Sequence, residues 1–487
     1  MSPEKRSSYA RSSVSVPSTA HTNAPVVDTG TERVVVEYST WRKACIVLTT
    51  SWMAFTTAFS SAALFPAIPN IASDLETSTG VIYATNAGVF ICLGLSAFIW
   101  LPLMHFFGRR KVYYTTGLVF LALSIATALA PTIHTWIVVR CLSHLLQGTV
   151  FHIAGQAVLA DIFVPTQRGT AIGCFLIGTV SGPALGPCIG GLIVTFANWR
   201  AIFWVQTGMV VLGLLLTLLT YPSEVEIMNP TSTGPSTANP LHILTLFRLP
   251  NLALSNVACA LISFSQYSLL VAPRHIINPR FGLTTPLVSG LFYLSPLSGF
   301  ILGTLAGGRY SDHVVRSWTN NRGRRVSHDR LRAGKTMFFL VIPASALVYG
   351  WCLQTHSGGL LVPIVAAFFQ AAGLFAALSG VNTYCVEAVP ERRMEVVAGK
   401  YFAQYGFGGA AAAGGMVPLI DAVGIGAATT IGVGMVLVAG VLVGTVAHHG
   451  EGMVQWAEKR KEQSGLRSHE TPPRPEQGRT SLHVEDA

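Results

Sequence analysis

Charged residues are scarce in this sequence: Asp, Glu, Lys and Arg make up 11% of 487 residues, and apolar residues make up 51%. A soluble globular protein carries roughly 25% charged residues. Much of the surface must therefore face something other than water, and we expect a lipid bilayer. The net charge of +10 does not indicate a nucleic-acid partner, because the basic residues lie in short runs between apolar segments.

Motifs for catalysis or metal binding are also lacking. The eight cysteines fall inside apolar segments, without the spacing of a zinc site or of a disulfide framework. No nucleophile–base pair or phosphate-binding loop stands out, so we expect no enzyme, no metal and no cofactor. Residues 1–42 have no early apolar core, so we expect no cleavable signal peptide.

Twelve apolar segments are long enough to cross a bilayer, which takes about 20 residues each. They are roughly 44–66, 81–104, 112–131, 135–160, 170–196, 200–221, 251–273, 286–308, 335–355, 359–385, 396–420 and 424–447. We expect an all-α polytopic membrane protein of two six-helix bundles. Its expected parts are a disordered cytoplasmic tail (1–42), a first bundle (43–221), a cytoplasmic linker (222–250), a second bundle (251–447) and a second disordered cytoplasmic tail (448–487).

The distribution of positive charge supports this topology. With both termini in the cytoplasm, 28 of the 32 Lys and Arg residues fall in cytoplasmic segments. The loop after 359–385 supplies three of them, the last being Lys400. Only Arg200, Arg274 and Arg280 lie outside, and Arg140 lies within a span. This asymmetry follows the positive-inside rule.

The two halves look like repeats. Asp161 follows the fourth span and is followed by Pro165 and Arg168, and Glu387 follows the tenth and is followed by Pro390 and Arg393. Parallel six-helix repeats build a central site near the bilayer midplane in one class of transporter.

The fifth span contains GTVSGPALGPCIGG at 178–191. Its glycines recur every four residues and form one face without side chains: Gly178, Gly182, Gly186 and Gly190. Another helix can approach such a face closely. Pro183 and Pro187 remove backbone donors and favour a bend. We interpret this smooth face as a surface along which a neighbouring helix slides when the protein changes conformation. The alternative is ordinary helix packing.

This segment, followed by NWRAIFW (198–204), resembles the antiporter motif of the major facilitator superfamily, in its twelve-span drug:proton antiporter branch. Four other segments are similar to family segments: FGRRKVY (107–113), ADIFVPTQRGTAIG (160–173), GGRYSD (307–312) and YCVEAVPERR (384–393). The resemblance, strongest for fungal exporters of metabolites and organic acids, implies alternating access by rocking of the bundles, usually coupled to protons. It also implies a functional monomer in the plasma membrane. His105 and Leu101 depart from the family's loop signature.

The cytoplasmic loops offer residues for gating. Asp161 can pair with Arg109 or Arg110 across the helix ends, and Asp312 stands in the loop of the second half. We hypothesise that Asp161 and Asp312 anchor contacts that stabilise one state. The alternative is that they are ordinary charges at helix ends.

A polar stripe runs along the fourth span, where Arg140, His144, Gln147 and Phe151 share one helical face. Burying an Arg at a helix centre costs on the order of 3 kcal/mol, so this face should turn to a cavity. We interpret it as a site for substrate and protons; the alternative is a structural Arg bound by backbone carbonyls.

Other spans add candidate substrate-binding residues: Asn86, Asn256, Gln266, Tyr267, Gln370 and Asn382. Each alone is typical of a hydrogen bond between helices. Together they indicate a moderately polar central cavity with aromatic walls.

No Asp or Glu lies in the middle of a predicted span, so a cation would find no buried carboxylate. Arg140 instead suits a carboxylate. We therefore expect a proton-coupled exporter of a small-molecule anion, for example a small dicarboxylate or an acidic secondary metabolite. His144 and His152 are candidates for the proton site. The alternatives are a multidrug exporter of neutral amphipathic compounds and a membrane sensor with a transporter fold, which the absence of a recognisable signalling domain disfavours.

Overall fold

The computed structural model describes residues 38–163, 165–221, 242–281, 291–389 and 392–469, and every regular element in these ranges is a helix. The first half contains α1 (Thr40–Ala62), η1 (Phe65–Ala67), α2 (Ile68–Asp74), α3 (Thr79–Phe107), α4 (Arg109–Ala128), α5 (Ile133–Gln147), α6 (Val150–Ile162), α7 (Pro165–Phe196) and α8 (Arg200–Thr220). The second half contains α10 (His242–Thr245), η3 (Leu246–Arg248), α11 (Pro250–Phe281), α13 (Leu294–Arg322), α14 (Asp329–Arg332), η4 (Met337–Val341), α15 (Ile342–Thr355), α16 (Leu361–Ala388), α17 (Arg393–Ala403), η6 (Gln404–Gly409), α18 (Ala410–Val423) and α19 (Ile425–His469).

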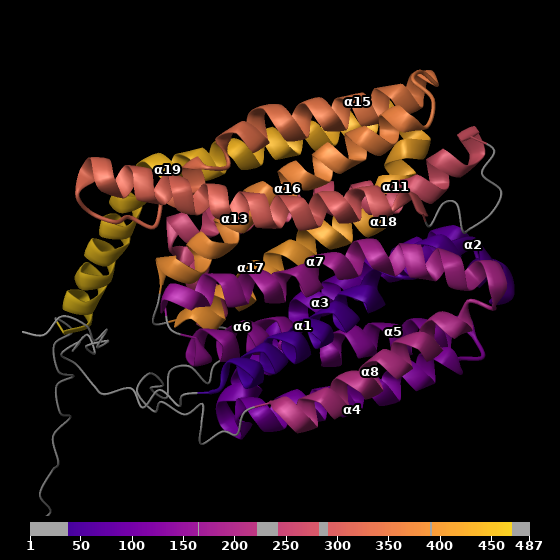
Figure 1. Cartoon of the computed structure of the whole chain (residues 1–487), viewed down its shortest axis with the longest axis horizontal. Helices are drawn as coiled ribbons and strands as arrows, with labels where there is room; N and C mark the ends of the chain where they lie inside the picture. Colours follow the sequence, from indigo (N-terminus) through magenta and orange to yellow (C-terminus); the bar gives the residue numbers. More distant parts are fainter. Residues whose placement is uncertain (1–37, 164, 222–241, 282–290, 390–391, 470–487) are drawn as a thin grey trace, which may run out of the picture. The chain divides into compact units, whose positions relative to one another are not determined.

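The predicted all-α membrane architecture is confirmed. Within the described ranges, 11 helical segments are long and apolar enough to cross a bilayer, and most run alongside one another (Figure 1). The predicted span at 286–308 corresponds to α13, and its first five residues lie outside the described part. We count α13 as the remaining span because it packs along α16 as the other long helices pack on their neighbours.

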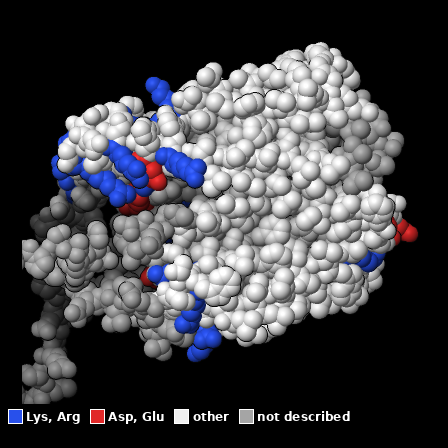
Figure 2. All heavy atoms as spheres, in the orientation of Figure 1, with Lys and Arg blue, Asp and Glu red and all other residues white. Residues whose placement is uncertain are grey.

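The outer faces of these helices suit a lipid environment. Large apolar side chains project outward, among them Leu219, Phe196 and Leu361, which are 84%, 78% and 70% exposed. On the face drawn in Figure 2, Lys and Arg gather mainly at the end where α13 meets its loop, and a broad surface without charge separates the two ends. The charge distribution is therefore that of helices embedded in a bilayer.

Close helix contacts hold each half together. The glycine face of α7 packs against α1: a Cβ added at Gly182 would lie 2.5 Å from the Ala58 Cβ, and one at Gly190 would lie 2.0 Å from the Ala63 carbonyl oxygen. α7 stays helical through Pro183 and Pro187. The close approach predicted from the sequence is present, and its partner belongs to the same half.

Two helix pairs form most of the contact between the halves, and α6 with α17 and η1 with α11 add smaller contacts. α3 packs against α17, η6 and α18, and α7 packs against α13. The first pair includes a backbone contact, since a Cβ added at Gly94 of α3 would lie 2.8 Å from the Gly406 nitrogen of η6. η6 is a short π-helix, a form that is frequent at functional sites.

Two predicted boundaries differ from the structure. The fourth span is not one helix, because Gly148 adopts a φ of +43° and separates α5 from α6. A Cβ at Gly148 would lie 2.0 Å from Ser96, so only glycine fits the break. Residues 448–469 continue α19 where we expected a disordered tail. The expectations for residues 1–37, 222–241 and 470–487 lie outside the described residues.

Candidate functional site

A polar and aromatic cluster lies where α6 of the first half meets α17 and η6 of the second. The Gln156 amide nitrogen donates to the Tyr401 hydroxyl at 2.8 Å, and the His152 ring lies 5.3 Å from the Tyr401 ring. Gln156 and His152 belong to α6, and Tyr401 belongs to α17. All three side chains are buried. Any separation of the halves on this side must break these contacts.

Lys400 places a positive charge in this cluster. Its side chain is 2% exposed, and Nζ donates to the Asn382 Oδ1 at 2.9 Å and lies 3.8 Å from the centre of the Tyr401 ring. Among the described residues no carboxylate comes within 4 Å of this ammonium group. The only acid in α17 is Glu395, whose carboxylate pairs with Arg392.

Lys400 was not among the predicted site residues, because the charge count assigned it to the cytoplasmic loop although it falls in the predicted span 396–420. The structure places it in the third turn of α17, inside a candidate membrane span. One signal was available: Lys400 follows VVAG and precedes YFA, so its flanks are apolar. A buried ammonium carries a desolvation cost that only partners or function explain.

Aromatic rings surround the charge. Tyr401 and Tyr405 stack at 5.6 Å with an interplanar angle of 6°. Phe90 of α3 lies edge-on to Tyr267 at 4.6 Å and 6.3 Å from Tyr405. Tyr267, predicted as a substrate-binding residue, is thus part of the cluster, as is Asn382. Asn256 lies beside it, since a Cβ at Gly399 would be 3.9 Å from its amide nitrogen.

The break in the fourth span adds to the polarity of this region. α6 begins at Val150, and the first amide groups of a helix lack acceptors within that helix. The Ser96 hydroxyl accepts from the Thr149 amide at 2.8 Å. His152 lies in the first turn, 1% exposed, and neither ring nitrogen has a hydrogen-bond partner among the described residues. The positive end of a helix dipole therefore lies near Lys400.

Arg140 lies elsewhere, among helices of the first half. Its Nη2 donates to the Ser60 carbonyl at 2.7 Å, and the guanidinium faces the Phe203 ring at 5.3 Å and the Trp136 ring at 5.9 Å. Its Nε has no partner in the described part of the chain. His144 approaches the same segment, with Nε2 3.4 Å from the Ser60 hydroxyl oxygen. The predicted stripe is buried, but its charge contacts α1, α5 and α8.

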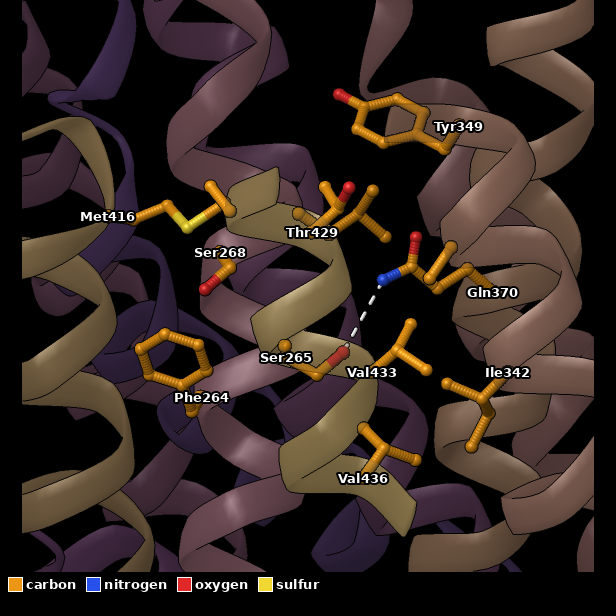
Figure 3. A pocket seen from close by; sticks show the side chains of 14 residues that line it. Phe264, Ser265, Ser268, Ile342, Tyr349, Gln370, Met416, Thr429, Val433 and Val436 are labelled. Carbon is orange, nitrogen blue, oxygen red and sulfur yellow. Dashed lines mark hydrogen bonds between the residues drawn. The ribbon is translucent and has the colours of Figure 1, made fainter. Parts of the chain in front are cut away.

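Three other predicted residues, Asn86, Gln147 and Gln266, are buried, and each has amide atoms that find no partner in the described ranges. Gln370 instead lines a small cavity inside the second half (Figure 3). Its Nε2 points at the Ser265 hydroxyl oxygen, 3.4 Å away. The cavity, with about 20 Å³ for a water-sized sphere, has room for one water. It lies between α11, α15, α16, α18 and α19, so it is separate from the contact between halves.

Ion pairs at the helix ends correspond between the halves. In the first, Arg109 pairs with Asp161, and Arg110 lies over the Tyr114 ring. In the second, Arg330 donates to Glu387 at 2.9 Å and to Asp312 at 2.6 Å. The acid after the fourth span and the acid after the tenth thus each bind an Arg from a loop in their own half. Asp161 pairs with Arg109 rather than with Arg110.

Comparison with known proteins agrees with the helical membrane architecture. A family model described as "Major Facilitator Superfamily" matches residues 50–413. The MFS-type transporter phiD of a fungal species is 26% identical over 85% of this chain and 70% of its own length. The efflux pump radE of Floropilus chiversii is 25% identical over 69% of this chain and 67% of its own. The MFS antiporter QDR3 of Candida albicans is 31% identical over 38% of this chain and 26% of its own.

Proposed function

We propose that this chain, which belongs to the Major Facilitator Superfamily, exports an organic acid or an acidic secondary metabolite by alternating access coupled to protons. The family makes it an integral membrane transporter of a small molecule, not an enzyme. The relatives named as efflux pump and antiporter support export and exchange. We place it in the plasma membrane as a functional monomer of the drug:proton antiporter branch, with both termini in the cytoplasm.

The observation that carries the proposal is the Lys400 ammonium group. It lies beside the contact between the halves: its neighbours, the Asn382 amide and the Tyr401 ring, belong to the second half, and Tyr401 contacts Gln156 of the first. A charge-assisted hydrogen bond contributes about 1.5–3 kcal/mol, and a carboxylate supplies both the acceptor and the opposite charge. An anion is therefore the ligand that best completes this environment.

Arg140, which the sequence suggested as the residue that binds the anion, is assigned a smaller role. The guanidinium donates to a backbone carbonyl and faces two rings of its own half. It contributes to the positive potential inside the first bundle, but the described contacts give it no position between the halves. We propose that Arg140 supports the site indirectly and that Lys400 binds the anion.

Proton exchange needs a group that can gain and lose a proton near the anion. His152 has this chemistry, is buried beside Tyr401, and makes no hydrogen bond through either nitrogen within the described ranges. We propose His152 as the proton site. The ion pairs Arg109–Asp161 and Arg330–Asp312, together with the glycine face of α7, remain proposed conformational elements.

One alternative has a specific observation in its favour. The rings of Phe90, Tyr267, Tyr401 and Tyr405 would also suit a neutral amphipathic compound, as a multidrug exporter requires. The two proposals differ in what they require of Lys400. A neutral substrate gains nothing from the ammonium group, whereas an anion loses its main partner when that group is removed.

The test is metabolite profiling of the medium of cells that express the chain, compared with growth in the presence of neutral drugs. We expect Lys400→Met to lower the extracellular acid about tenfold or more. Lys459→Met removes the same charge from an exposed position of α19 and should change nothing. Arg140→Ala should lower export less, relative to the amount at the membrane. An acid whose export survives Lys400→Met would overturn the anionic substrate.

A further inference from the structure

We infer that the exported anion is a monocarboxylate that carries a planar aromatic ring. This inference rests on the proposed function and narrows it. It depends on two features of one cluster: a single buried ammonium group, and a set of four packed rings of which Tyr401 lies beside that group.

The charge around Lys400 matches one carboxylate. The ionisable groups that face it are His152 from α6, Cys259 from α11 and Cys385 from α16, and its own helix adds Tyr401. Within the described residues, Lys400 is the one fixed charge among them. The Arg140 guanidinium is held by the Ser60 carbonyl and offers no second anchor here. A dicarboxylate would bring a second charge into a region of low dielectric without a partner, which is costly.

The rings match a planar partner. Tyr401 and Tyr405 are parallel within 6°, so they present flat faces, and Phe90 reaches Tyr405 from the other half. When the halves separate on this side, the contacts of Phe90 with Tyr267 and Tyr405 must be lost. A planar aromatic ring can replace them by stacking or by an edge-on contact, whereas a saturated ring of similar size lacks the matching charge distribution.

The two features are adjacent. The Lys400 Nζ lies 3.8 Å from the centre of the Tyr401 ring, so an anion at this ammonium is also beside a ring face. The first turn of α6, with the unpartnered His152, lies against the same ring. A ligand whose carboxylate is attached to its ring, or close to it, would contact both features at once.

The experiment is isothermal titration of the purified full chain in detergent at pH 7.5 with four probes. Benzoate has charge and ring, cyclohexanecarboxylate has charge without an aromatic ring, succinate has two charges, and benzyl alcohol has a ring without charge. We expect benzoate to bind at least tenfold more tightly than each of the others. Lys400→Met should remove its advantage over benzyl alcohol, and Tyr405→Leu should remove its advantage over cyclohexanecarboxylate.

Two variants serve as matched controls. Lys459→Met removes an exposed charge, and Phe196→Leu removes an aromatic ring that is 78% exposed on the outer face of α7. Both should keep the order of the probes.

The outcomes separate the two proposals. If cyclohexanecarboxylate or succinate binds as tightly as benzoate while Lys400→Met still weakens every acid, the aromatic monocarboxylate is wrong and the anion exporter stands. If benzyl alcohol equals benzoate and Lys400→Met changes neither, both are wrong. The probe order in the unmodified protein decides the matter even if a variant fails to fold.

Discussion

Replacing Gly190 by Ala should destabilise the first half, and the structure gives the size of the effect. The added Cβ would lie 2.0 Å from the Ala63 carbonyl oxygen, which belongs to the backbone of α1 and cannot move alone. Restoring an ordinary contact requires the helices to separate by more than 1 Å, and such overpacking typically costs about 1–3 kcal/mol. The higher helix propensity of Ala returns about 1 kcal/mol at most. The net expected loss is about 0–2 kcal/mol.

Gly173 supplies the matched control because it lies in the same helix and a Cβ there would meet nothing within 4 Å. Gly173→Ala should therefore be neutral or slightly stabilising. The assay is unfolding of the purified protein in detergent as the denaturant SDS is added, followed by circular dichroism. The Gly190→Ala midpoint should fall and the Gly173→Ala midpoint should hold or rise. Equal midpoints for the two variants would refute the reasoning from helix separation.

Two further predictions concern the charged helix ends. Asp312→Asn should reduce transport severalfold at an equal amount of protein in the membrane, because the Arg330 contact at 2.6 Å loses its charge; unchanged transport would contradict a role in gating. Burial lowers the pKa of His328, which packs against Gly450, so the folded protein resists its protonation. Stability should be highest above pH 6.5, the ordinary pKa of His, and fall as the pH drops towards the lowered value. His328→Gln should flatten that dependence in a thermal unfolding series, and a dependence that persists would exclude His328 as its source.

The architecture could be predicted because each span carries its own evidence. A helix in lipid must satisfy its backbone internally, so about 20 apolar residues identify it without knowledge of its neighbours. The glycine face of α7 can likewise be recognised from its own sequence, since four glycines on one face of a helix indicate a close helix contact. The identity of the partner, α1, was not predictable, because the spacing of glycines says nothing about which helix approaches them.

The break in the fourth span shows the opposite case. Gly148 is one of 47 glycines, and its neighbours LLQ and TVF read as a continuous apolar helix. Its positive φ is fixed by Ser96 of α3, which occupies the space that a side chain would fill. The cause is therefore a tertiary contact between residues 52 positions apart in the sequence.

The proposed site keeps the chemistry expected from the sequence, a buried cation, but lies at another location. The absence of acids from the middle of the predicted spans indicated a positive interior. Among the described residues, the buried acids Asp329 and Glu395 lie at helix starts, and each pairs with an Arg. The buried charge beside the contact between the halves, however, is Lys400 rather than Arg140. A lysine near a basic loop is assigned to the cytoplasmic side until its burial is known. The polar residues identified from the sequence do not gather at one place. Asn382 accepts a hydrogen bond from Lys400, whereas Gln370 faces a separate cavity within the second half.

The Lys400 ammonium group, which has no carboxylate partner among the described residues, also explains how an anion could drive alternation between states. A ligand shifts a conformational equilibrium only by the difference in its affinity for the two states. In the state described here Lys400 is enclosed, and its neighbours are an amide and a ring. In a state open on this side the same ammonium would be hydrated, and a bound carboxylate would gain little from it. The carboxylate therefore binds most tightly when the site is closed around it, so binding favours closure. Export follows if the halves then separate on the opposite side of the membrane.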